Sequence, residues 1–251
     1  MKKTLIALAM AASAVVSGSV IAADWEASGF GGTVEMRGTL TPPVKSVPWE
    51  VKVGASVNNL DADIKSGQKS VDFRLERVAP VLSIRNTSRD YVSFWGATPQ
   101  ISYDGALDLG AFNHGVATLT LPVSDGTSDI GQIKIPLTAL ATAAQLGGKT
   151  YSSLMAPSEG TLFYGGLPIN GAAVFDGSDK MNEFDPEALV NFIPTGDVSA
   201  QGDIVVEESG KYSAVYVSAI DANQSVSINL DKPATTSITW KASLPITVSY
   251  L

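Results

Sequence analysis

Short segments of alternating apolar and polar residues, separated by turn-forming residues, restrict the fold class of this chain. The clearest examples lie near the C-terminus, at 211–220, 225–230, 237–240 and 244–250. Alternation with a period of two gives a strand one buried face and one wet face. The Asp, Asn and Pro residues between these segments supply turn chemistry. Many short strands at such spacing are typical of a sandwich or barrel, so we predict an all-β protein.

Helical patterns occur only in the middle of the chain. Residues 137–146 are rich in Ala and Leu and end at a pair of glycines, which predicts a helix with a glycine stop. Residues 185–192 begin with an N-cap aspartate and a proline, which predicts a second helix. Between them lies a segment rich in glycine and aromatic residues. We therefore expect a partly helical insertion on the β scaffold, at about 137–200.

The N-terminus has the pattern of a secretory signal. Lys2 and Lys3 precede an apolar run, and small residues lead to a cleavage site expected after Ala22. The apolar run is shorter than the ~20 residues that a bilayer core requires. We therefore expect residues 1–22 to be a signal peptide, and the mature protein to be exported rather than anchored.

Charge and cysteine content exclude several classes of function. Without the signal peptide, 17 basic and 25 acidic residues become 15 and 25, a formal charge of −10. This acidity argues against nucleic acid or an anionic membrane as the partner. The chain has no cysteine, so it has neither a thiol nucleophile nor a cysteine metal site.

Two terminal segments carry an unusual apolar alternation. In the first, one face carries Val34, Met36, Gly38 and Leu40. A glycine in such a row weakens an ordinary strand, yet it suits a strand pressed closely against another backbone. From alternation alone, residues 33–41 also fit the first strand of a self-contained sandwich.

The C-terminal strand has the same alternation and ends close to an aromatic residue. Its apolar positions are Leu244, Ile246, Val248 and Tyr250.

The chain resembles fimbrial subunits of the K88 (F4) family of chaperone–usher pili. The resemblance rests on blocks in the expected order, none of them specific alone: KKTLIAL at 2–8, WEVKVG at 49–54, PQISYDGA at 99–106, FYGGL at 163–167 and ATTSITW at 234–240. These blocks span nearly the whole chain.

The resemblance implies an incomplete immunoglobulin-like sandwich that a donor strand completes. Residues 23–41 would then be the donor-strand extension, and 42–251 the pilin domain. The C-terminal strand would border the acceptor groove and contact a chaperone. The expected partners are neighbouring fimbrial subunits, a periplasmic chaperone and an outer-membrane usher, on a route through the periplasm to a surface fimbria.

Two departures from pilin patterns bear on the role. Common pilins have a disulfide and a glycine near the end, where this chain has no cysteine and carries Ile238. The cysteine-free state is itself K88-like. The mature chain is also shorter than the major adhesive subunit of that family, which favours a minor subunit.

Candidate chemistry for an enzyme is weak. His114 is the only histidine, and no Gly-x-Ser-x-Gly elbow accompanies it. The acidic stretch 176–185 fails the EF-hand spacing and contains Lys180. Gly165 and Gly166 lack the following helix and lysine of a nucleotide loop. We expect no enzyme, no metal and no cofactor.

A host glycan is a further candidate partner, because the inserted segment of the major K88 subunit carries its receptor surface. The corresponding aromatic residues are Tyr151, Phe163, Tyr164 and Phe175. Alternatively, these aromatics pack the insertion onto the sheet. A receptor-binding adhesin and a self-contained secreted β-domain thus stand as alternatives to a structural subunit.

Overall fold

The computed structural model describes residues 47–174 and 179–251, so the expected signal peptide and the segment 23–41 lie outside it. The strands are β1 (Trp49–Val53), β2 (Ser70–Arg74), β3 (Ala79–Asn86), β4 (Pro99–Ser102), β5 (Val116–Ser124), β6 (Asp129–Gln145), β7 (Thr150–Leu154), β8 (Val198–Gly202), β9 (Tyr212–Ile220), β10 (Ser225–Leu230) and β11 (Thr247–Tyr250). The helices are α1 (Asp179–Phe184) and the 3-10 turns η1 (Leu109–Ala111), η2 (Gly171–Ala173) and η3 (Ala188–Asn191). The all-β prediction is confirmed, and no helix in the described part is long and apolar enough to cross a membrane.

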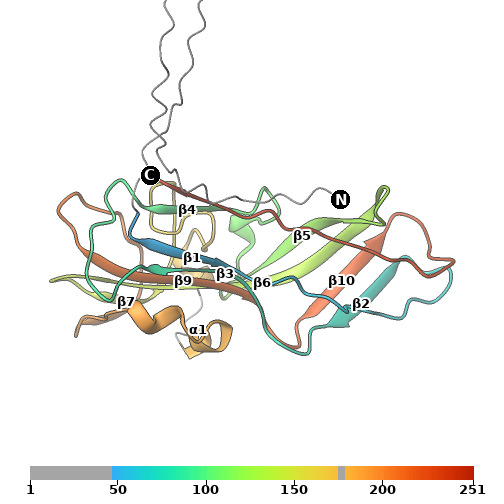
Figure 1. Ribbon diagram of the computed structural model, residues 1–251, viewed down its shortest axis with the longest axis horizontal. Coiled ribbons are helices and arrows are strands. Elements are labelled where there is room, and N and C mark those ends of the chain that lie inside the picture. The colour runs from blue at the N-terminus through green and yellow to red at the C-terminus, as the bar shows by residue number, and fades with distance from the viewer. Residues whose placement is uncertain (1–46, 175–178) are drawn as a thin grey trace, which may run out of the picture. The chain divides into compact units, whose positions relative to one another are not determined.

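Most strands belong to one sheet in the order β1-β3-β9-β6-β10-β2, while β4 and β11 form a second, two-stranded sheet. The long strand β6 joins two regions of the larger sheet. Its first part pairs with β5 and β10, and its second part pairs with β9 and β7. All pairings are antiparallel except that of β7 with β8. In Figure 1, β4 lies above the β1–β3–β9 region and α1 lies below it.

The helix predicted at 137–146 is wrong, because this segment is the second part of β6. It pairs residue by residue with β9, from Thr138 opposite Ala219 to Gln145 opposite Tyr212. Helix propensity is a weak local preference that tertiary packing overrides. The alanines serve the packing here, because their small side chains leave room for aromatic rings above the strand.

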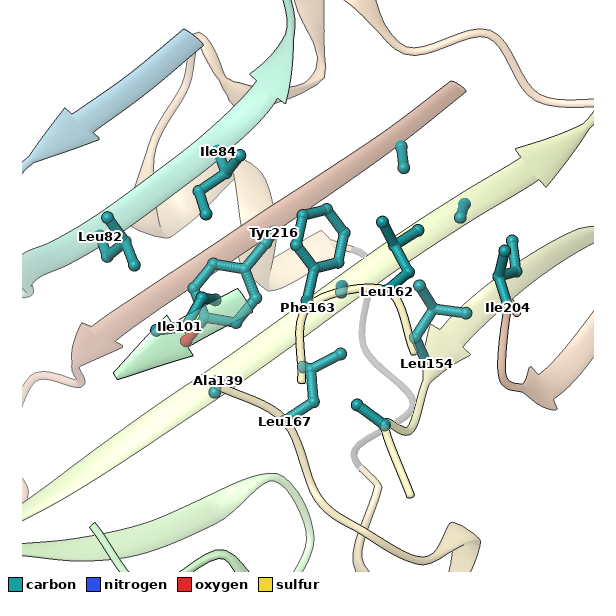
Figure 2. Close-up of a cluster of buried hydrophobic side chains, with 14 of the residues drawn as sticks. Leu82, Ile84, Ile101, Ala139, Leu154, Leu162, Phe163, Leu167, Ile204 and Tyr216 are labelled. Atoms are coloured by element: carbon teal, nitrogen blue, oxygen red, sulfur yellow. The ribbon is translucent and has the colours of Figure 1, made fainter. Parts of the chain in front are cut away.

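The main core lies between the two sheets. It combines side chains of β3, β4, β6 and β9 with those of the loop at 161–167. In Figure 2, Phe163 of this loop lies between Tyr216 of β9 and Leu162. The hydroxyls of Tyr103 and Tyr216 are 2.9 Å apart, and Tyr216 donates to the Gly166 carbonyl oxygen at 3.1 Å. These bonds satisfy the polar ends of rings buried in the core.

A smaller core covers the opposite face of β9. Met181 and Phe184 of α1 and Ala188 of η3 pack against Val215 and Val217. Both faces of β9 are therefore buried, which explains its nearly continuous apolar sequence.

The second predicted helix, at 185–192, is also wrong in its bounds. The α-helix ends at Phe184, and only the 3-10 turn η3 follows. Asp185 accepts from the Glu187 backbone N–H, as a cap would, but it also binds Lys52 at 3.0 Å. Since β6, β7 and β8 belong to the sheet, the helical part of the expected insertion lies between β7 and β8.

Candidate functional site: an apolar groove

An open groove lies on one face of the sheet region formed by β5, β6, β10 and β2. Its cavity volume is about 1150 Å³, which is larger than a typical small-ligand pocket of roughly 300–1,000 Å³. Its floor is apolar and its two walls are chain segments, residues 53–64 and 234–246.

The floor is built by cross-strand alignment. Ile133 of β6 lies opposite Leu121 of β5 on one side and Ile228 of β10 on the other. Ile228 in turn lies opposite Val71 of β2. Directly opposed residues point to the same side of a sheet, so these four side chains form one apolar row across four strands. All four line the groove.

The first wall, residues 53–64, is held near its start by Gly54. The Gly54 backbone N–H donates to the Val81 carbonyl oxygen at 3.0 Å. A Cβ at Gly54 would lie 1.8 Å from the Pro80 carbonyl oxygen, so only glycine allows this crossing. A second cavity of about 680 Å³ lies between residues 55–61 and 73–80. The first wall is therefore bordered by cavities on two sides.

The rim of the groove exposes apolar side chains. Val53 is 60% exposed and Val57 is 44% exposed. Val53 ends β1, which lies at the end of the sheet order and pairs with β3. A rim of this kind, next to an edge strand, offers both apolar contact and backbone pairing to an added strand.

The second wall is the C-terminal segment. The Lys241 and Ser124 backbones exchange two hydrogen bonds of 2.9 Å, which hold this wall against β5. Residues 237–240, expected as a strand, have no regular strand structure, and β11 is shorter than the expected strand 244–250. Trp240 lies 6.2 Å from Phe73, between ring centroids.

The alternation expected in the C-terminal strand is found. Leu244, Ile246, Val248 and Tyr250 are half-buried against the core, while the residues between them are exposed. Leu244 and Ile246 line the groove, and Val248 and Tyr250 continue the row along β11. Burial raises the pKa of the Tyr250 phenol.

The FYGGL block supports the strand that holds β11. The Ile101 N–H of β4 donates to the Tyr164 carbonyl oxygen at 2.8 Å, and β4 pairs with β11. Gly165 has a φ of +87°. A Cβ there would lie 1.8 Å from the Ile101 carbonyl oxygen. Glycine therefore meets two requirements at once, a left-handed backbone and close contact with β4.

Of the aromatic residues expected to bind a glycan, three lie in the described part of the chain, and they differ in exposure and in the element that carries them. Phe163 is fully buried between Trp49 and Tyr216, which removes it from the candidates for a surface sugar site. Tyr151 lies on β7 and Tyr164 in the loop beside β4, both half-buried against the core. Phe175 lies outside the described residues. Phe163 therefore packs the inserted segment onto the sheet, which was the alternative to a sugar contact.

The groove carries little reactive chemistry. Its charged lining residues are Asp61, Asp63 and Lys241. His114 is exposed in a turn with a φ of +47°, and its ring lies 2.7 Å from the Asn113 side-chain oxygen. Over residues 47–174 and 179–251, no group of three metal-ligating side chains occurs. This arrangement suits the binding of an apolar peptide strand.

Sequence reasoning named the C-terminal wall but missed the floor and the first wall. The floor was readable as alternation in 116–124 and 225–230. The donor residues Val34, Met36, Gly38 and Leu40 lie outside the described residues. The first wall shows no alternation, because it is held in place by the contact of Gly54 with Pro80 and Val81.

Comparisons with known proteins agree with the resemblance seen in the sequence. The K88 family described as "Fimbrial, major and minor subunit" matches residues 1–251. K88 fimbrial protein AB of Escherichia coli is 30% identical over the full length of both chains. K88 fimbrial protein AD and F41 fimbrial protein, both of Escherichia coli, are 29% and 28% identical over their full lengths. This chain therefore belongs to the K88 family of fimbrial major and minor subunits, which are structural proteins and not enzymes.

Proposed function

We propose that this chain joins its neighbours in a surface fimbria by donor-strand exchange. Its groove accepts the extension of one neighbour, and its own residues 33–41 enter the groove of another. The observation that carries the proposal is the apolar groove of about 1150 Å³ beside an edge strand. Family membership already makes the chain a fimbrial structural subunit that associates with other subunits.

The apolar row of the extension suits such a groove. Four alternate positions, from Val34 to Leu40, span about 20 Å in an extended strand at ~3.3 Å per residue. Burying the three large side chains would gain about 1.5–3 kcal/mol each. Gly38 would let the strand come close to the floor, since it adds no side chain there. Backbone pairing with the edge would add to this gain.

The same geometry explains a need for a chaperone. An empty apolar groove beside a strand edge invites aggregation. We propose that a periplasmic chaperone caps the groove and that an outer-membrane usher exchanges it for a neighbour's extension. The short mature chain supports a minor position in the fimbria.

The test of donation replaces Gly38 with leucine and compares it with Thr39→Ala on the opposite face of the same segment. Both variants are co-expressed with the chaperone and the other subunits. Gly38→Leu is expected to abolish incorporation into fimbriae while still forming a one-to-one chaperone complex, because its acceptor groove is unchanged. Thr39→Ala is expected to incorporate normally. Normal incorporation of Gly38→Leu would contradict strand donation.

The test of the groove is size-exclusion chromatography of the mature chain with and without the chaperone. A stable complex with chaperone, and polymers or aggregates without it, is the expected result. A chaperone-free monomer that unfolds cooperatively would show a complete fold and overturn the proposal.

A further inference from the structure

A tight turn presents an exposed tryptophan at one end of the described domain. The Ala97 N–H donates to the Phe94 carbonyl oxygen at 2.9 Å, which closes a four-residue turn. Gly96 has a φ of +65°, as the third position of a type II turn requires. Trp95 at the tip is 58% exposed, whereas Phe94 is 0% and Ala97 is 5% exposed.

Both ends of the turn are fixed in the core. The Phe94 ring lies 4.2 Å from the Trp49 ring and 5.4 Å from the Tyr212 ring, between centroids. The Trp49 indole N–H donates to the Ala97 carbonyl oxygen at 2.7 Å. The turn cannot fold over to bury Trp95 without breaking these contacts. The backbone that carries Trp95 is therefore fixed by the core, and the Trp95 side chain stays 58% exposed.

The turn contacts residues near both ends of the described part of the chain. Trp49, which contacts the two ends of the turn, begins β1. On the other side, Thr98 and Leu251 exchange backbone hydrogen bonds of 2.9 and 3.1 Å. Leu251 is the last residue of the sequence and is 50% exposed. Two exposed apolar residues, Trp95 and Leu251, thus lie on segments that meet at residues 97 and 98, and Ala97 is bonded to Trp49 near the start of the described domain.

The length of the extension limits how far the next subunit can be. Six residues, 41–46, lie between Leu40, the last apolar residue of the donor row, and Val47. The seven steps from Leu40 to Val47 span at most about 25 Å when fully extended. Under the proposed donor-strand exchange, on which this inference rests, Leu40 sits in the groove of the next subunit. Leu40 therefore lies within about 25 Å of Val47, which limits how far that subunit can be from the 94–97 turn.

We infer that Trp95, with Leu251 beside it, is a docking contact for the subunit that holds this chain's donor strand. Tryptophan is enriched among the residues that dominate interface energies, and a rigid presentation lowers the entropy lost on docking. The contact would fix the angle between successive subunits, which a strand joined by a short linker does not fix alone. Single exposed aliphatic residues need no such explanation.

The test uses a photoreactive benzoylphenylalanine at single positions of the full chain, in fimbriae assembled with the other subunits and the chaperone. The positions are Trp95, the groove-rim residue Val53 and Val190. Val190 is a matched control, because it is also 58% exposed but lies on η3 at the outer face of the sheet. After irradiation, denaturing gels and mass spectrometry identify the subunit and peptide attached.

The expected result is an adduct from Val53 to a neighbour's 33–41 segment, and an adduct from Trp95 to the subunit that holds this chain's own donor strand. Val190 is expected to give several-fold less of either product. An adduct at Val53 without one at Trp95 would overturn the docking contact and keep donor-strand exchange. An equal yield at Val190, or attachment of Trp95 to something other than a subunit, would also overturn it. No adduct at Val53 would refute donor-strand exchange and this inference with it.

A second measurement tests the energy of the contact. Trp95→Ala is expected to speed the dissociation of assembled subunits about tenfold, as for a hot-spot residue worth about 1.4 kcal/mol. Val190→Ala, treated in the same way, is expected to leave the rate unchanged. Equal rates for Trp95→Ala and wild type would contradict the inference.

Discussion

One part of the sandwich is filled with aromatic rings, while the other is left open. In the filled region, Phe163 lies 5.6 Å from Trp49 and 5.5 Å from Tyr216, between ring centroids. In the open region, the aliphatic floor beneath the groove faces a cavity of about 1150 Å³. The same strand, β6, contributes to both regions.

The difference lies in what covers each part of the sheet. The chain supplies its own cover for the filled region, since the loop at 161–167 places Phe163 into the core. Over the groove, the described chain supplies partial cover: Leu60, Trp240 and Leu244 of the two walls pack against the floor, and the cavity remains between them. Under the proposed donor-strand exchange, further cover for the groove would come from the 34–40 row of another subunit. A glycine-rich loop and a donated strand would then solve the same packing problem in two different ways.

The largest effect is expected in the filled region. Phe163→Ala would remove a fully buried ring and leave a cavity, at a cost of about 3–5 kcal/mol in the free energy of unfolding. Denaturant unfolding of the mature chain, saturated with a peptide of residues 33–41, measures this cost. Val190→Ala, at an exposed site, is expected to stay within about 0.5 kcal/mol of wild type. A small effect for Phe163→Ala would mean that the filled region is loosely packed.

The next effect separates backbone strain from close contact. Gly165→Ala would force alanine into a left-handed backbone and place its Cβ against the Ile101 carbonyl oxygen. Gly105 has a similar φ of +76° but open space around the same position, so Gly105→Ala reports strain alone. We expect about 1 kcal/mol for Gly105→Ala and about 1–3 kcal/mol more for Gly165→Ala. Equal costs, from the same unfolding measurement, would show that β4 moves freely away from the loop.

Most strands of the two regions could be predicted from local sequence patterns, but the burial of Phe163 and the open groove could not. Alternation identified β9 and β10, because each has one or two faces against a core. It failed at 137–146, where alanines favour a helix locally but pair with β9 in the fold. Phe163 resembled a sugar-stacking residue, since nothing in its neighbours reveals its burial. The groove remains because no strand within residues 47–174 and 179–251 crosses it, which no local pattern encodes.

The third prediction concerns the rim of the groove. Val53 is 60% exposed in the structure. With the 33–41 peptide bound, Val53→Ala should cost about 1–1.5 kcal/mol, since the missing methyl groups would then be buried. Val190→Ala, at a similarly exposed site away from the groove, should stay within about 0.5 kcal/mol of wild type in the same peptide-bound state. Thermal melts of the peptide-bound chains measure both costs, and equal costs would indicate that the peptide does not cover this rim.

The smallest effect concerns α1 and η3, which cover the outer face of β9 and do not line the groove. The buried Asp185 carboxylate binds Lys52 at 3.0 Å, and Lys52 is 58% exposed. Burial alone would raise the pKa of Asp185, but hydrogen bonds from Ser83 and Lys52 outweigh it and lower the pKa below its ordinary 3.8. The stabilisation is therefore present above pH 3.8 and is lost as the pH falls through the lowered pKa.

Asp185→Asn should cost about 1 kcal/mol or less at pH 7, because solvent screens the exposed partner. The cost should shrink as the pH falls below 3.8, since the wild-type carboxylate then also becomes neutral. A double-mutant cycle with Lys52→Met, measured by unfolding at pH 7 and at about pH 3, isolates the pair. If the coupling between Asp185 and Lys52 grew on acidification, this ion pair would not be what links the end of α1 to β1. If the coupling faded, the link would be a charge contact that acid weakens. The filled region and the groove would keep their apolar packing at the same pH.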